Sequence, residues 1–351
     1  MTTVSAVADT PPPDWDALVV DAPGGHVVQG TASAAHRAAQ GWVPRFVTFD
    51  DGRGALVIVR RRRVRGATGY CPRGPISAGD GPERVAERAV ALAAAMRAEG
   101  LVALAVDPEL DDAPGYDRLL AGAGFHSIEE IQAGRHRLVV DLPAGTTEAS
   151  LLAGCTKTAR QRIRGAAAAG TVVEATTADA DLAAFGALLE STAERKAFWI
   201  GSPSALTAWW RRVLDSGQGL MLVARNGGRI AGGLFLYRQG GHLATAYSAD
   251  DPALREVLKG TMHLVRFTAM TMALAEGAPV IDLGTVDVPG ARREPVAGEP
   301  TFGLYEHKRS LGAHWVESAA AHEIVLRPWR NAIVTAAARL VPGRFTGRRA
   351  R

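Results

Sequence analysis

The sequence predicts an α+β (α/β) fold made of two tandem units, each a mixed β-sheet flanked by helices. The chain has 351 residues, a length typical of two domains. Short segments rich in apolar and β-branched residues alternate with Ala-rich helical segments along the whole chain. The order of these elements recurs once, although the amino-acid sequence itself does not repeat. We therefore expect domains at residues 1–147 and 148–326, followed by a basic amphipathic tail at residues 327–351.

The elements of the first unit have local signals. Residues 45–49 and 54–59 are β-rich and are separated by Asp50-Asp51-Gly52, which predicts a hairpin. Residues 82–100 form an Ala-rich segment that stops at a glycine, as helices often do. A buried-type strand follows at residues 101–108, with the acidic residue Asp107 at its end. The remaining elements expected here are a helix at 26–42, a strand ending near Tyr70, a helix at 116–123 and a strand at 137–142.

The second unit follows the same order. A helical segment ends at Gly170, and a long apolar helix is expected at residues 254–276. Three strands separated by short turns are expected between them, at residues 219–224, 229–237 and 240–248. The other expected elements are helices at 148–169, 178–195 and 203–215 and strands at 171–174, 279–283 and 315–325.

The composition bounds the class of protein. Apolar residues make up 47% of the chain and charged residues 22%, which is typical of a soluble globular protein. The formal charge is only +4, but basic residues cluster at 60–65, 157–164 and 344–351. Such clusters indicate contacts with phosphates or an anionic surface, and a solvated face is the alternative for each.

The cysteines and the apolar segments argue against a disulfide-rich, a secreted or a membrane-spanning protein. Cys71 and Cys155 lie far apart and give neither a metal-ligand spacing nor a disulfide framework, which favours a reducing cytoplasm. The first residues lack the charged start and apolar core of a signal peptide. No segment reaches the roughly 18 apolar residues that a spanning helix needs.

Three strands followed by a long helix resemble the GNAT acetyltransferase fold. An acyl-CoA enzyme of that fold needs a pyrophosphate loop, Q/R-x-x-G-x-G/A, between a strand and a helix, where backbone N–H groups face the anion. Residues 162–167 fit these letters but lie inside a helical segment with no strand before it. Residues 254–260, at the expected place, lack the pattern. The sequence therefore disfavours acyl-CoA as the donor.

Several segments, in order over residues 22–325, resemble the FemABX-type aminoacyltransferases that build peptidoglycan cross-bridges. They are residues 29–37 with Gly41-Trp42, 70–75, 106–109, 124–125 with 131–132, 159–164, 192–195, 246–248, 281–284 and 302–312. The resemblance implies two GNAT-like domains and aminoacyl-tRNA in place of acyl-CoA. Family members with a coiled-coil arm insert a long charged helical pair in the second domain. This sequence has no such insertion, so we expect no arm.

The resemblance implies the reaction. An amine on the stem peptide of a UDP- or lipid-linked muropeptide precursor attacks the ester of aminoacyl-tRNA, which serves as a co-substrate. Ester to amide is downhill, so we expect no cofactor and no metal. The site must position the groups, deprotonate the amine and stabilise the oxyanion. Two alternatives remain: a GNAT-fold acyltransferase that uses acyl-CoA, and a non-catalytic envelope- or RNA-binding protein.

Two residues are the expected catalytic groups. Lys308 lies in an aromatic, basic run and matches the family lysine that stabilises charge on the tRNA side, whereas a surface lysine beside a buried tyrosine is the alternative. Asp107 follows a buried strand, and the resemblance implies that it binds the attacking ammonium and helps to deprotonate it. Its alternative is a turn or a helix cap.

Four residues are expected to bind the precursor. Arg37 matches the family lysine that holds the diphosphate, and its guanidinium offers phosphate a bidentate fork. Tyr70 and Tyr247 would supply hydroxyl groups, with buried core tyrosines as the alternative. Arg195 would reach the same phosphates, unless it only forms an ion pair within its helix.

Arg160 and Arg164 are the expected tRNA contacts. They lie four positions apart, on one helix face, and a solvated face is the alternative. The tail at residues 327–351 has apolar residues at helical spacing flanked by arginines. It would lie on an anionic membrane or pack on the second domain. We therefore expect a cytoplasmic monomer, at the inner face of the membrane if the tail binds lipid.

Overall fold

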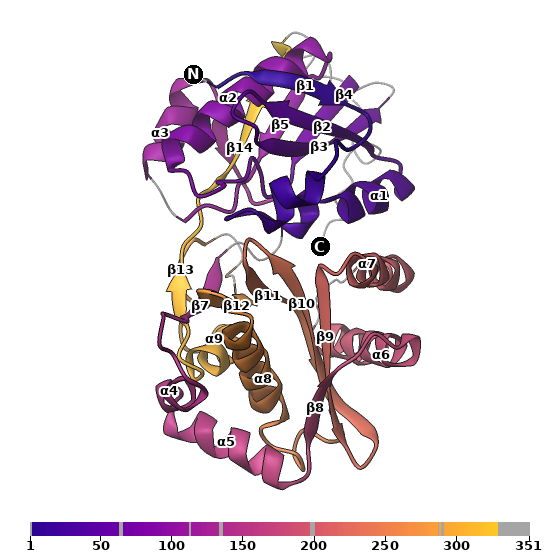
Figure 1. Cartoon of the computed structure of the whole chain (residues 1–351), viewed down its shortest axis with the longest axis vertical. Coiled ribbons are helices and arrows are strands. Elements are labelled where there is room, and N and C mark those ends of the chain that lie inside the picture. The colour runs from indigo at the N-terminus through magenta and orange to yellow at the C-terminus, as the bar shows by residue number, and fades with distance from the viewer. Residues whose placement is uncertain are drawn as a thin grey trace. The chain divides into compact units, whose positions relative to one another are not determined.

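A computed structural model of the chain describes residues 2–62, 66–111, 114–132, 136–196, 201–286, 288 and 291–328. It divides into two compact units (Figure 1). Unit 1 comprises Met1–Ile131 and Ala319–Arg351, and unit 2 comprises Gln132–Ser318. The described residues of each unit form one seven-stranded sheet. The predicted α+β class with two mixed sheets is confirmed.

Both sheets have the same topology. Four antiparallel strands are joined, through one parallel pair, to three further strands that are antiparallel to one another. The order in unit 1 is β1 (Val4–Ala8), β2 (Val43–Phe49), β3 (Gly54–Arg62), β4 (Gly66–Cys71), β5 (Ala103–Val106), β14 (Ala321–Val325) and β6 (His126–Ile128). In unit 2 the corresponding order is β8 (Val172–Ala175), β9 (Gly219–Asn226), β10 (Arg229–Gln239), β11 (His242–Asp250), β12 (Val280–Thr285), β7 (Arg137–Asp141) and β13 (His314–Val316). The parallel pairs are β4–β5 and β11–β12.

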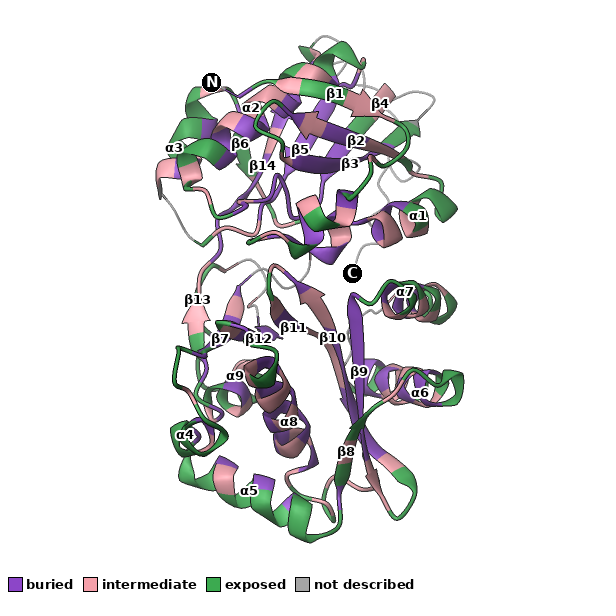
Figure 2. Ribbon diagram, in the orientation of Figure 1, coloured by how far each residue is buried: buried purple, intermediate pink, exposed green. Residues whose placement is uncertain are grey.

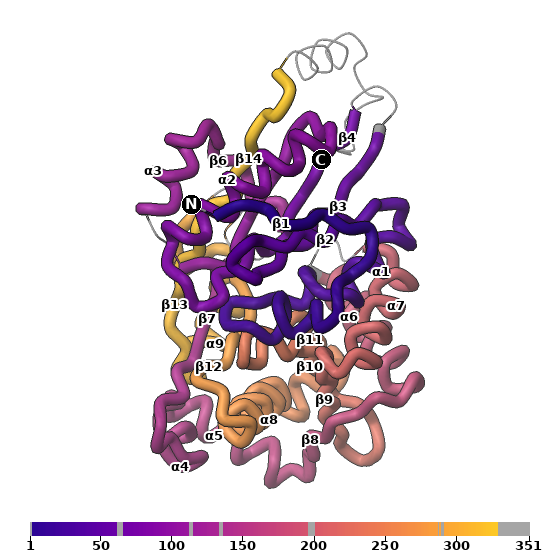
Figure 3. The backbone as a smooth tube through the Cα atoms, turned by 45° about the horizontal axis from the view of Figure 1, so that its top comes forward, coloured from indigo at the N-terminus to yellow at the C-terminus, as the bar shows by residue number. Residues whose placement is uncertain are grey.

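Helices cover both faces of the sheet in unit 1. On one face, α2 (Pro82–Ala98) and α3 (Pro114–Gly122) bury apolar side chains against alternate residues of the strands. The other face carries η1 (Ala17–Asp21), η2 (Val27–Gln29) and α1 (Thr31–Ala39). Figure 3 follows β1, β2 and β3 as neighbours in this unit, and β2–β3 is the predicted hairpin.

Unit 2 has the same layered construction. The helix α8 (Thr261–Ala275) packs against one face of the sheet, where α4 (Glu148–Gly154), α5 (Lys157–Ala168) and α9 (Phe302–Arg309) also lie. The other face carries α6 (Asp179–Lys196) and α7 (Pro203–Asp215). Figure 2 shows that α8 is mostly buried and α5 mostly exposed. Among the described helices the longest is α6, with 18 residues, so the structure contains no coiled-coil arm in these residues.

The limits of the units differ from the predicted division at residue 147. The strand β7 precedes that division in sequence, yet it pairs with β12 and β13 of unit 2. The expected closing strand at residues 315–325 is two strands, β13 in unit 2 and β14 in unit 1. These short apolar segments pair through backbone groups, so their amino-acid sequence does not specify which of the two sheets they join.

Other differences concern helix ends and the tail. The helix predicted at residues 254–276 begins only at Thr261, because residues 252–260 form turns that bond within themselves. The helical segment at residues 148–169 is broken at Cys155-Thr156 into α4 and α5. Residues 63–65 of the first basic cluster and residues 329–351 of the tail lie outside the described residues. None of the helices described is both long and apolar enough to span a membrane.

Candidate active site

A pocket opens in unit 2 where β11 and β12 separate. The two parallel strands pair only at Leu243↔Ile281 and Ala244↔Asp282. Immediately beyond, the pairing of β11 with β10 shifts register between Thr245 and Tyr247, which is the geometry of a β-bulge at Ala246 and bends the strand. The resulting pocket has a volume of ≈ 500 Å³. The fold itself therefore creates a cavity at the parallel pair of this sheet.

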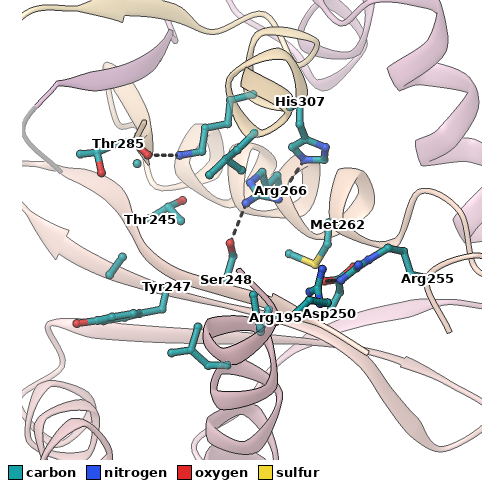
Figure 4. Close-up of a pocket in the computed structure, with 18 residues that line it drawn as sticks. Arg195, Thr245, Tyr247, Ser248, Asp250, Arg255, Met262, Arg266, Thr285 and His307 are labelled. Carbon is teal, nitrogen blue, oxygen red and sulfur yellow. Dashed lines mark hydrogen bonds and ion pairs between the residues drawn. The ribbon is translucent and has the colours of Figure 1, made fainter. Parts of the chain in front are cut away.

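The pocket is strongly basic. Side chains from β11, β12, α6, α8 and α9 line it, and Figure 4 shows them. The charged groups among them are four cations and one carboxylate, namely Arg195, Arg255, Arg266, Lys308 and Asp250. Asp250 is already held by Arg255 through two hydrogen bonds of 2.6 and 2.5 Å. The described residues contain no cluster of His, Cys, Asp or Glu suited to a metal ion. The arrangement favours an anionic ligand.

Lys308 lies on α9 with its ammonium inside the pocket wall. Its side chain is only 3% exposed, and Nζ donates a hydrogen bond to the Thr285 carbonyl at 3.0 Å. Gly284 leaves room for it: a Cβ there would lie 3.3 Å from Nζ and 2.8 Å from the Thr245 carbonyl oxygen. The structure thus places a desolvated cation where two strands separate. Its catalytic role stays a prediction.

Replacing Gly284 is expected to damage both stability and activity. Gly284 has φ +86°, a conformation that costs a residue with a Cβ about 1–2 kcal/mol. The new methyl group would also press on the Thr245 carbonyl and on the Lys308 ammonium. We therefore expect Gly284→Ala to lower the free energy of unfolding, measured by urea unfolding, and the rate of the transfer reaction that the sequence predicts, measured by a turnover assay.

Gly241→Ala is the matched control for this substitution. Gly241 has φ +77°, but a Cβ there would meet nothing within 4 Å. The substitution Gly241→Ala therefore has only the conformational cost of the positive φ angle, without a steric clash. Equal losses of stability in both variants, with full activity in Gly284→Ala, would contradict a positioning role for Gly284.

A buried polar cluster behind Lys308 was not predicted from the sequence. The Arg266 guanidinium donates to Ser248 Oγ at 3.0 Å and contacts His307 Nε2 at 3.0 Å (Figure 4). The rings of His263 and His307 lie 4.0 Å apart, centre to centre. His263 and Arg266 are three positions apart in the apolar helix α8, so they share one face. Two polar residues on one face of such a helix are the signal that could have revealed the cluster.

Both histidines of the cluster stay neutral in the folded protein. Burial, followed by the charges of Arg162 and Arg266, lowers the pKa of His263 to about 4. Burial and the charge of Arg266 are also the main causes that hold the pKa of His307 far below its usual range. A neutral His307 that accepts from Arg266 at Nε2 carries its proton on Nδ1.

Acidification is expected to destabilise unit 2 through these histidines. The pKa of His263 is lower in the folded protein than in the unfolded chain, so its contribution is complete above about pH 6.5 and is lost as the pH falls towards 4. A shift from 6.5 to about 4 corresponds to about 3 kcal/mol. Urea unfolding at pH 7.5, 5.5 and 4.5 should show this loss, and His263→Gln should weaken it. An unchanged slope in His263→Gln would contradict the assignment.

The predicted residues Arg195 and Tyr247 lie at the same pocket as Lys308. Arg195 is exposed near the end of α6. The Tyr247 ring packs edge-on against Trp210, with ring centres 5.4 Å apart. Burial raises the pKa of Tyr237 well above its usual range, and the neighbouring Tyr247, with which it hydrogen-bonds, adds to the effect. Tyr247 therefore belongs both to the pocket wall and to the aromatic core.

The two expected tRNA contacts differ in their surroundings. Arg160 Nη1 donates to the Ala153 carbonyl at 3.1 Å and to the Cys155 carbonyl, so it closes the C-terminus of α4. Arg164 is exposed on α5. Arg162, which was not selected from the sequence, is exposed as well and lowers the pKa of His263 and His307. The positive charge of α5 thus acts on the buried polar cluster through Arg162.

The other predicted residues lie in unit 1. Asp107 is fully buried after β5, and its carboxylate accepts from the Tyr70 hydroxyl at 2.7 Å and from the Arg73 backbone N–H at 2.6 Å. Arg37 is half-buried on α1, where it donates to Gln40 at 3.3 Å. The structure therefore brings Tyr70 and Asp107 together, whereas the described side-chain hydrogen bond of Arg37 is to Gln40, at the C-terminal end of its own helix.

Comparisons with known proteins agree with this architecture. Residues 153–309 match the family model of an acetyltransferase (GNAT) domain. Among solved structures, FemX is similar with a TM-score of 0.77 and 17% identity, over 96% of this chain and 99% of that one. A conserved protein of unknown function from Bacteroides thetaiotaomicron has a TM-score of 0.58 and 12% identity, over 90% and 98%. L-PGS from Bacillus licheniformis has a TM-score of 0.51 and 14% identity, over 97% of this chain and 99% of that one.

No curated protein matches the chain in sequence. The match over residues 153–309 covers unit 2 from α4 to the end of α9, which includes every residue that lines the pocket. The resemblance in fold to the FemABX-type family is confirmed. The chain therefore has the FemX-type fold, and its residues 153–309 match the family model of a GNAT acetyltransferase domain.

Proposed function

We propose that the protein transfers a small amino acid from aminoacyl-tRNA to an amine of the stem peptide of a peptidoglycan precursor. The observation that carries this proposal is the basic pocket of unit 2, with a buried lysine at the separation of β11 and β12. The FemX-type fold over 96% of the chain supports it. The nucleic-acid donor and the muropeptide acceptor are both anionic, as such a pocket requires.

The chemistry needs little more than placement and charge. The acceptor amine attacks the ester carbonyl, a C–N bond forms, and the carbonyl oxygen becomes an oxyanion. The C–O bond to the tRNA ribose then breaks, the ribose oxygen takes up a proton, and the amine loses one. Lys308 Nζ would stabilise the negative charge on these oxygens, because a desolvated, fixed ammonium acts more strongly than one in water.

The remaining predicted residues have supporting roles in this proposal. Arg164 and the neighbouring cations of α5 would contact tRNA phosphates, since the helix carries no acidic residue. Arg195 and Tyr247, at the pocket, would contact the substrates. Arg37 would hold the precursor's diphosphate, and Asp107 would act on the acceptor amine. The tRNA donor implies a cytoplasmic location, and the basic tail would contact the inner face of the membrane.

The match to an acetyltransferase domain favours a second donor, an acyl-CoA. A coenzyme A pyrophosphate in this fold would sit at the N-terminus of α8. A Cβ on Gly260, at the cap of that helix, would lie 2.3 Å from the Arg162 carbonyl oxygen, so the backbone of α5 occupies this place. The amides of Leu254, Leu258 and Thr261 already donate within the turns. These contacts argue against the acyl-CoA donor.

Incubation with both donor classes tests the proposal. The protein is mixed with tRNA pools charged with glycine, alanine or serine, and with UDP-linked or lipid-linked precursor, and the products are weighed by mass spectrometry. We expect a mass increase of one amino-acid residue. An acetyl increase from acetyl-CoA, with no transfer from charged tRNA, would establish the second donor instead. No transfer from any donor would overturn both.

A further inference from the structure

Arg266 is a buried cation that forms no ion pair with a described carboxylate. It lies on α8, is 2% exposed and lines the pocket. Its two terminal nitrogens contact a hydroxyl, Ser248 Oγ, and an imidazole nitrogen, His307 Nε2. Its Nε is buried and has no hydrogen-bond partner in the described structure. A guanidinium normally enters a protein interior with an anion beside it, because its desolvation is otherwise uncompensated.

The neighbours of Arg266 cannot serve as that anion. His307 is neutral, and Ser248 is uncharged. Asp250 lies near enough to raise the pKa of Arg266, yet both of its oxygens bind Arg255. Burial lowers the pKa of Arg266 to about 10, so the guanidinium remains charged at neutral pH. The guanidinium of Arg266 therefore keeps its charge, and no described carboxylate forms an ion pair with it.

Three elements fix the direction of this guanidinium. Ser248 comes from β11 and His307 from α9, and both hold Arg266 from α8 (Figure 4). Lys308 and Arg195 line the same pocket from α9 and α6. A planar guanidinium matches the oxygens of phosphate better than a point charge does. The site is thus built for an oxyanion before any ligand enters.

We propose that Arg266 is the anion-binding residue of this pocket and takes the phosphodiester nearest the 3′ end of the donor RNA, with Ser248 and His307 as positioning residues. This assignment rests on the proposed function for the identity of the donor. The shared chemistry is a phosphate group, which coenzyme A also carries. Binding at Arg266 would set the distance between the ester and Lys308, which lies beside His307 in sequence.

Binding of short probes tests the assignment apart from catalysis. The probes are an RNA trinucleotide ending in cytidine-cytidine-adenosine, adenosine alone, and coenzyme A, each titrated by calorimetry. We expect Arg266→Met to weaken trinucleotide binding at least tenfold and to leave adenosine binding unchanged. The slope of log K against log salt concentration should fall by about 0.7, the value for one phosphate contact in a single strand.

Two further variants keep the test decisive. Arg212→Met is the control, since Arg212 is exposed on α7 and does not line the pocket. It should bind the trinucleotide as the wild type does. Arg266→Lys keeps the positive charge but cannot form two parallel hydrogen bonds to one phosphate. It should bind the trinucleotide between three- and tenfold more weakly than the wild type. It also decides the question if Arg266→Met does not fold.

The outcomes separate this inference from the proposed function. Trinucleotide binding that depends on Arg266, without any aminoacyl transfer, would support the anion site and overturn the proposed function. Transfer and trinucleotide binding at wild-type levels in Arg266→Met would overturn the anion site alone. If only coenzyme A binding depended on Arg266, the phosphate source assigned here would be wrong.

Discussion

Lys308→Ala is expected to lower the kcat of transfer about 100- to 1000-fold, the loss typical of removing one fixed donor to an oxyanion. The substitution removes the ammonium that lies in the pocket wall, 3.0 Å from the Thr285 carbonyl. The effect should fall on kcat more than on KM, because the charge is needed most when the ester oxygen becomes negative. Single-turnover transfer from charged tRNA measures the chemical step directly.

The controls for Lys308 separate charge from folding. Lys308→Met fills nearly the same volume without the charge and should be as inactive as Lys308→Ala while remaining folded. Lys259→Ala removes a lysine of the same unit whose side chain is 73% exposed, and should be fully active. A kcat within threefold of the wild type in Lys308→Met would show that the lysine only supports the pocket wall.

Much of the fold could be predicted because its signals are local. The turn at Asp50-Asp51-Gly52 and the three strands β9, β10 and β11 follow from alternating β-rich segments and their turn residues. The assignment of β7 and β14 to their sheets could not be predicted in this way. Each is five residues long, and its partners lie far away in sequence, so only tertiary packing decides which sheet it joins.

The candidate site was predicted in part, for a related reason. Lys308 stands out as a cation among aromatic and glycine residues, and Tyr70 and Asp107 stand out at strand ends. Arg266 and His263 are hidden in an apolar helix, where a polar residue usually faces solvent. Their burial against α9 depends on the packing of elements that are about 40 positions apart.

The repeated topology explains where the predicted catalytic residues lie. In unit 1 the parallel strands β4 and β5 stay paired over four positions, from Thr68↔Ala103 to Cys71↔Val106. Asp107 follows directly and binds the turn after β4. In unit 2 the equivalent strands pair at only two positions and then separate, which opens the pocket beside Lys308. The corresponding position in the two sheets, at the end of the parallel pair, thus holds a buried hydrogen-bonded carboxylate in unit 1 and a cavity in unit 2.

Asp107→Ala is expected to lower the free energy of unfolding of unit 1 by about 3 kcal/mol, because it leaves two buried donors without their acceptor. These donors are the Tyr70 hydroxyl and the Arg73 backbone N–H. The loss of the second matters further, because Arg73 has φ +52°, a conformation that needs support from its surroundings. Urea unfolding followed by tryptophan fluorescence would measure the change.

Two milder variants distinguish support of the fold from catalysis. Tyr70→Phe removes the hydrogen bond from the Tyr70 hydroxyl to Asp107 and should cost about 1 kcal/mol, so it calibrates the stability effect. Asp107→Asn keeps an acceptor oxygen but removes the negative charge. If the carboxylate acts on the attacking amine, kcat in Asp107→Asn should fall at least 100-fold in protein that is still folded, and the loss should not be restored at lower temperature. Full activity in folded Asp107→Asn would limit Asp107 to holding the turn at Arg73, and deprotonation of the amine would have to come from another group.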